Sequence, residues 1–78
     1  MEAERRPSSA HDAADWVANF LRNISCPEEH VGKAKDCIVD QRIDGEVLVD
    51  MPAADIETVR HLTYGDAKKL EKAWLVWL

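Results

Sequence analysis

The 78-residue chain has a formal net charge of −5, and 46% of its residues are hydrophobic. A chain of this length forms one small domain, and the composition is typical of a folded unit rather than of a disordered segment. The acidic balance argues against nucleic acid as the main partner, because contacts to phosphates need a dominant basic surface.

No stretch of the sequence has the length and hydrophobicity of a membrane span or of a signal peptide. The longest uninterrupted apolar run is AWLVWL, from Ala73 to Leu78. We therefore expect a cytoplasmic protein that has no membrane partner.

The two cysteines, Cys26 and Cys37, lack the CxxC and paired Cys/His spacings of zinc sites. We expect two reduced thiols at buried or half-buried helix positions, with a disulfide between them as the minority alternative. Neither a metal nor any other cofactor is expected.

Residues 1–10 have no apolar periodicity and are expected to form a flexible leader. Within them Arg5 and Arg6 precede Ser8 and Ser9 in an arrangement that could form a basophilic kinase site. Such short matches are common by chance, so this motif does not set the function.

Two helices are predicted after the leader. Ser9 with Asp12 three residues later resembles a capping box, and the apolar positions of the helix that follows are Ala13, Trp16, Val17, Phe20, Leu21 and Ile24. Ser25 is expected to cap the second helix, with Pro27 near its first turn. The inner positions of that helix are Val31, Ala34 and Ile38.

From Ile38 to Arg60 the apolar residues come in short bursts, which Gly45 and Pro52 interrupt. No burst is long enough for an ordinary helix, so the pattern predicts several short helices or turns. Residues 47–49 read Val-Leu-Val and could suggest a strand, but a lone strand has no partner with which to pair.

The last helix has the clearest pattern. It starts at Thr63 or Gly65, and its predicted core positions are Ala67, Leu70, Trp74, Trp77 and Leu78. Leu75 and Val76 fall outside that stripe. We expect all three tryptophans in or beside the core of a compact all-α bundle.

The order and spacing of these residues resemble the sterile alpha motif (SAM) domain, a five-helix interaction module. The likeness rests on four groups: Trp16, Val17, Phe20 and Leu21; Val31, Ala34 and Ile38, which match in spacing; the I-D-G of residues 43–45 with Leu48, Met51, Asp55 and Ile56; and Gly65 with Leu70. It implies a compact five-helix SAM-like bundle over residues 11–78, with a long C-terminal helix.

Charge is segregated along the chain. Between Asp36 and Glu57 there are seven acidic residues and one basic residue, so the net charge is −6. From Arg60 to Lys72 the net charge is +2, before any contribution from His61. This pattern predicts a molecule with an electrical dipole. Gly45 is expected to let the acidic segment turn tightly and expose its carboxylates.

The SAM resemblance implies that these two segments form docking surfaces, an acidic mid-loop and a basic end-helix. The mid-loop candidates are Asp44, Val47 and Asp50, flanked by Asp40 and Glu46. The end-helix candidates are Gly65, Lys68 and Lys69, with His61, Tyr64 and Lys72 nearby. The expected partner is another SAM domain or a second copy of this chain, within a larger adaptor or signalling protein.

An enzyme is not expected, and neither is a small-molecule substrate. His11, His30 and His61 are scattered over different predicted elements. No Ser or Cys has a recognisable nucleophile context.

RNA stem-loop binding is the alternative function, because some SAM domains use the basic start of the last helix in this way. Lys68, Lys69 and Lys72 could contact phosphates there. Asp66 and the acidic middle of the chain oppose such binding, since both repel the RNA backbone.

Overall fold

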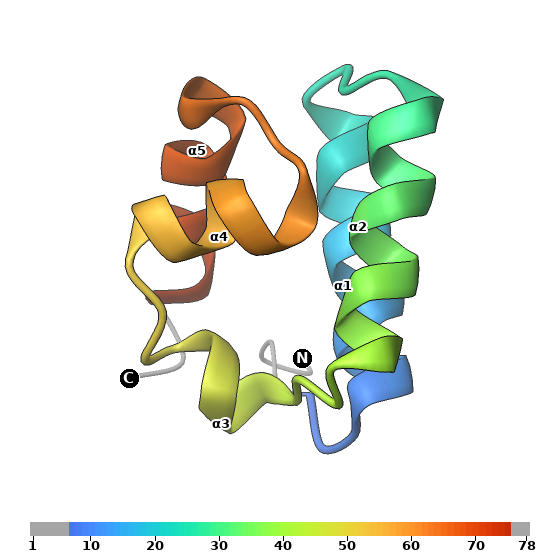
Figure 1. The fold of residues 1–78 in the computed structure, drawn as a ribbon, viewed down its shortest axis with the longest axis vertical. Coiled ribbons are helices and arrows are strands. Elements are labelled where there is room, and N and C mark those ends of the chain that lie inside the picture. The colour runs from blue at the N-terminus through green and yellow to red at the C-terminus, as the bar shows by residue number, and fades with distance from the viewer. Residues whose placement is uncertain (1–6, 76–78) are drawn as a thin grey trace, which may run out of the picture.

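The structure is a computed structural model that describes residues 7–75, apart from the side chains of residues 57–60 (Figure 1). Over these residues the regular structure is all helix, without strands, and the predicted all-α class is confirmed. The five helices of this range are α1 (Ala10–Asn23), α2 (Glu28–Asp40), α3 (Gly45–Leu48), α4 (Ala53–Arg60) and α5 (Tyr64–Trp74).

The helices form two groups joined through a common core. In Figure 1, α1 and α2 lie side by side and antiparallel, α4 and α5 pack beside them, and α3 closes the lower end. The radius of gyration is 11.1 Å, close to the value of about 11.5 Å expected for a compact chain of this length. The predicted short helices in the middle of the chain are α3 and α4, and residues 47 and 48 are helical rather than extended.

Side-chain caps fix the starts of three helices. The Ser9 hydroxyl accepts a hydrogen bond from the Asp12 N–H at 3.1 Å, as the predicted cap requires. Thr63 caps α5 in the same way, through the N–H of Asp66 at 3.3 Å. Asp44 caps α3.

The predicted cap at Ser25 is wrong, because Ser25 belongs to the turn that ends α1. Its φ is 63°, its N–H donates to the Arg22 carbonyl at 3.1 Å, and the next N–H, of Cys26, donates to the Leu21 carbonyl at 2.9 Å. This is the Schellman pattern of helix termination. The residue before α2 is Pro27, and it makes no side-chain capping bond.

The tight turn assigned to Gly45 is also wrong. No glycine among the described residues has a positive φ, and Gly45 is the first residue of α3. The turn is made by Arg42, whose φ is 55° and whose N–H donates to the Val39 carbonyl at 3.1 Å. The N–H of Ile43 then donates to the Ile38 carbonyl at 3.0 Å, which completes a second Schellman motif.

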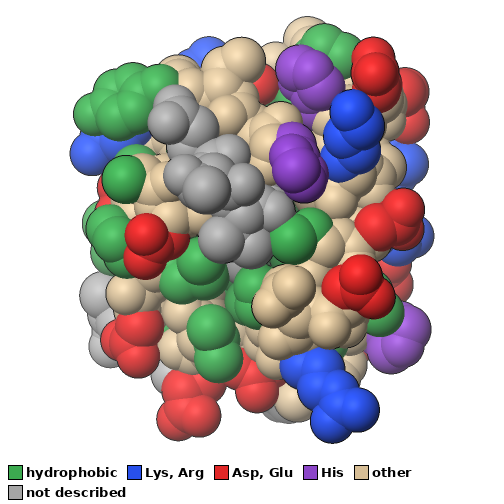
Figure 2. Space-filling view, viewed as in Figure 1, with side chains coloured by type: hydrophobic (Ala, Val, Ile, Leu, Met, Phe, Trp, Pro, Cys, Tyr) green, Lys and Arg blue, Asp and Glu red, His purple; other side chains and the backbone are tan. Residues whose placement is uncertain are grey.

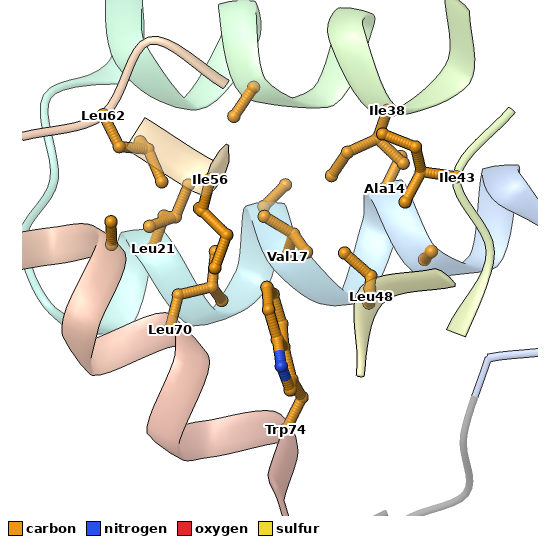
Figure 3. Close-up of a cluster of buried hydrophobic side chains, with 14 of the residues drawn as sticks. Ala14, Val17, Leu21, Ile38, Ile43, Leu48, Ile56, Leu62, Leu70 and Trp74 are labelled. Atoms are coloured by element: carbon orange, nitrogen blue, oxygen red, sulfur yellow. The ribbon is translucent and has the colours of Figure 1, made fainter. Parts of the chain in front are cut away.

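The core lies between the two groups of helices. Figure 3 shows Trp74, at the end of α5, with its ring extending towards Val17 of α1 and Leu48 of α3. Fully buried side chains from all five helices make up this core, among them Leu21, Val31, Ala34, Ile38, Leu48, Ile56, Ala67 and Leu70. The predicted inner positions of α2 and α5 are therefore confirmed where they are described.

The tryptophans differ in their burial. Trp74 is fully buried, whereas Trp16 is half-buried and stacks on Phe20 with ring centroids 5.6 Å apart. Trp77 and Leu78, predicted for the core, and Val76 lie outside the described residues, as do the side chains of Glu57 and Arg60. Leu75, predicted outside the stripe, is 48% exposed.

Candidate interaction surfaces

The acidic candidates are arranged around α3, which two core residues anchor. Leu48 is fully buried and Ile43, just before the helix, is 5% exposed. The Asp44 carboxylate accepts a hydrogen bond from the Val47 N–H at 3.1 Å and so fixes the first turn. With Ile43 and Leu48 directed inward, the remaining residues form what we call the acidic surface: Asp44, Glu46, Val47 and Asp50.

This surface carries negative charge that the described residues leave without a salt bridge. Glu46 and Asp50 are exposed, and Asp44 is half-buried. The ion pairs formed among the described residues lie on α1, α2 and α5, and none includes a carboxylate of this surface. Figure 2 shows acidic side chains gathered at the lower left, over α3 and the turn after it. Val47 is 43% exposed and gives this charged surface an apolar contact point.

The basic candidates lie at the start of α5 and on the side of that helix. We call Tyr64, Gly65, Lys68, Lys69 and Lys72 the basic surface. Tyr64 is 59% exposed, and a Cβ added at Gly65 would meet open space, so a partner could approach the backbone there. The free N–H groups and the positive end of the helix dipole add to the attraction for carboxylates at this end.

The positive charge of the basic surface is smaller than the lysine content suggests. The ammonium Nζ of Lys68 lies 3.4 Å from Oε1 of Glu71, one turn further along α5. Lys69 and Lys72 are exposed, and neither forms an ion pair within the part of the chain that is described. These two lysines therefore provide the positive charge most open to a partner.

Asp66 has a structural role that the sequence did not indicate. Burial raises the pKa of the Cys26 thiol to about 11, and the charge of the Asp66 carboxylate and a hydrogen bond to it add to this rise, with a further contribution from Glu28. Cys26 is 7% exposed in the connection between α1 and α2. Asp66 is therefore directed towards this connection, and it is half-buried rather than fully presented on the basic surface.

The centres of the two surfaces lie at opposite ends of the molecule. In Figure 1 the chain enters α5 near the top of the view, whereas α3 lies at the bottom. Figure 2 shows hydrophobic and basic side chains at the upper left, over the start of α5, and acidic side chains over α3. The structure thus brings Asp44, Glu46, Val47 and Asp50 together, and separates them from the start of α5 at Tyr64. Lys72 lies near the other end of α5, two residues before Trp74.

Two outlying candidates do not follow this separation. Asp40 from the end of α2 and His61 from the turn before α5 line the same shallow hollow, with a volume of about 340 Å³. Its other lining residues are Lys33, Asp36, Cys37 and Gln41. Asp40, predicted for the acidic surface, and His61, predicted for the basic surface, therefore adjoin within one molecule.

The other chemistry considered for the described residues concerns metal ions and the two cysteines. No group of three or more His, Cys, Asp or Glu residues there could hold a metal ion. Cys26 is a buried free thiol and Cys37 a half-buried one. None of the described helices has the length and hydrophobicity needed to cross a bilayer.

Comparisons with models of protein families, with curated proteins and with solved structures found no match to this chain.

Proposed function

We propose that this chain is a non-catalytic protein–protein interaction module that docks on another SAM-type domain, either a different one or a second copy. In this proposal the acidic surface of one domain meets the basic surface of the other, within a larger adaptor or signalling protein. One observation carries the proposal: carboxylates without salt bridges to described residues surround the exposed Val47, at the opposite end of the molecule from the start of α5, where the exposed Tyr64 lies.

The expected energetics follow from the exposure of these groups. An exposed ion pair contributes only about 0–1 kcal/mol, so charge sets the orientation and the rate of encounter. The exposed parts of Val47 and Tyr64 supply apolar contact, which adds affinity. We expect an interface of about 1,200 Å² or less, a Kd on the order of micromolar, and weaker binding at high salt.

The two surfaces have different consequences for the choice of partner. Because they differ from each other, self-association would be head-to-tail and could extend into an open chain. The ion pair of Lys68 with Glu71 reduces the charge of the basic surface, whereas the acidic surface has no such pairing among the described residues. A partner domain with a stronger basic surface is therefore expected to bind more tightly than a second copy.

Sedimentation velocity tests this function directly. The chain is measured at several concentrations and at two salt levels, alone and mixed with SAM-type domains that carry a basic end-helix. We expect a reversible complex that weakens as salt increases. Absence of any complex at low salt would contradict the proposal. Binding of an RNA stem-loop in a gel shift, without any protein partner, would instead support RNA recognition.

A further inference from the structure

The segment before α1 contains a motif that the two surfaces do not explain. The sequence Arg5-Arg6-Pro7-Ser8 places arginines three and two residues before a serine. Serine kinases that select such substrates hold the two guanidinium groups with carboxylates, which arginine pairs with in a bidentate manner. A motif of this length is weak alone, and the place of the serine in the structure decides whether a kinase can use it.

The structure favours Ser8 over Ser9 as the acceptor. Both side chains are exposed, but the Ser9 hydroxyl accepts the capping bond from the N–H of Asp12 at 3.1 Å. The residue after Ser8 is extended, with φ −140° and ψ 165°, whereas Ala10, after Ser9, is already helical. A kinase binds the residues around its acceptor in an extended form. The chain bends at both serines, but Ser8, unlike Ser9, is followed by an extended residue and is separated from α1 by it.

Ser8 is also held close to the acidic surface. The carbonyl of Pro7 accepts a hydrogen bond from the N–H of Gly45, the first residue of α3, at 3.1 Å. Successive Cα atoms are about 3.8 Å apart, so Ser8 lies one residue from the point where the chain is joined to α3. A charge on Ser8 therefore lies within about one Debye length, roughly 8–10 Å, of the start of the acidic surface.

We propose that Ser8 is a phosphorylation site for an arginine-directed serine kinase, and that its phosphate extends the acidic surface. The Ser8 Oγ attacks the γ-phosphorus of ATP, and a new P–O bond forms as the bond to the bridging oxygen breaks. ADP leaves with that electron pair, and the hydroxyl proton passes to the catalytic carboxylate of the kinase.

The modification changes both charge and hydrogen bonding. The phosphate adds about −1.5 to −2 at neutral pH. The hydrogen bond that the Ser8 hydroxyl donates to Oδ2 of Asp12, at 3.4 Å, is lost with its proton. Tighter binding of a basic partner follows only if the proposed docking function holds, because this consequence rests on it.

The site is tested on the folded chain with MgATP and the catalytic subunit of cyclic-AMP-dependent kinase, followed by mass-spectrometric mapping. We expect one phosphate on Ser8, its loss in Ser8→Ala, and its retention in Ser9→Asn, which keeps a capping side chain. Arg6→Ala should slow the reaction about 10- to 100-fold, since one charge-assisted contact is lost. Phosphate on Ser9, or none on the folded chain, would overturn the assignment.

The position of the phosphate is tested by following its second ionisation with ³¹P NMR. Asp44→Asn removes a negative charge beside Gly45 but keeps a capping side chain, so the phosphate pKa should fall. Glu29→Gln, at the far end of the α1–α2 pair, should leave it unchanged. An equal pKa in all three proteins would overturn the placement. If both tests succeed and no basic domain binds, the docking function fails while the modification site stands.

Discussion

At the scale of single residues, neighbours in the sequence have opposite roles. Leu48, the last residue of α3, is fully buried beside Trp74. Val47, one position earlier, is 43% exposed. The SAM resemblance implied an exposed Val47, because it made this residue a docking contact, and Leu48 is one of the apolar residues on which that resemblance rests. The role of Asp66 beside Cys26 could not be predicted, because the sequence does not show that the α1–α2 connection packs against the start of α5.

Truncation of the two neighbours should separate folding from binding. Leu48→Ala is expected to lower the free energy of unfolding by about 2–5 kcal/mol, since it leaves a cavity in the core. Val47→Ala should change it by less than about 0.5 kcal/mol and yet weaken association with a partner. Urea denaturation and sedimentation of both variants measure these effects, and an equal loss of stability in the two would refute the assigned burial.

The Cys26 thiol should react slowly. A pKa of about 11 rather than 9.0 lowers its thiolate fraction at pH 8 by about 100-fold. In Cys37→Ser, alkylation of Cys26 by iodoacetamide should therefore be much slower than alkylation of Cys37 in Cys26→Ser. Asp66→Asn should accelerate the Cys26 reaction, because it removes a negative charge that opposes ionisation. Equal rates at the two cysteines would contradict this environment.

The same shift has a defined sign for stability. The folded state holds the Cys26 proton more tightly than the unfolded chain, because the folded pKa is raised. The contribution of the neutral thiol is therefore complete below pH 9 and is lost as pH rises towards 11.

At the scale of elements, the starts of α1 and α5 could be predicted, whereas the turns that end α1 and α2 could not. Ser9 and Thr63 have capping side chains that the sequence displays. The turns after α1 and α2 use Ser25 and Arg42 at positive φ, where glycine is the usual residue. The sequence therefore favours a turn at Gly45, the nearest glycine, and a cap at Ser25, and neither forms.

Glycine at the end of α2 should stabilise the fold. Arg42 has a φ of 55°, a conformation that costs a residue with a Cβ about 1–2 kcal/mol. Arg42→Gly removes this strain but gives the unfolded chain more freedom, so we expect a net gain of about 0.5–1 kcal/mol. Thermal unfolding of Arg42→Gly, with Arg42→Ala as the control that keeps the Cβ, measures the effect. A less stable glycine variant would refute the strained turn.

At the scale of the whole molecule, the sequence predicted an all-α bundle and the charge of each segment. It could not place Asp40 and His61 in one hollow, because that depends on how α2 packs against the turn before α5. The net charge of residues 60–72 likewise did not show that Lys68 is paired with Glu71. The separation of charge is therefore sharpest between α3 and the start of α5.

Reversal of charge on the acidic surface is the most direct test of this separation. Glu46→Lys with Asp50→Lys is compared with a control, Asp15→Lys with Glu29→Lys, which makes the same change of charge on α1 and α2. Sedimentation of each with the partner domain should show binding about 10-fold weaker or worse for the first variant, and nearly that of the parent for the control. Equal binding by the two variants would contradict docking through the acidic surface.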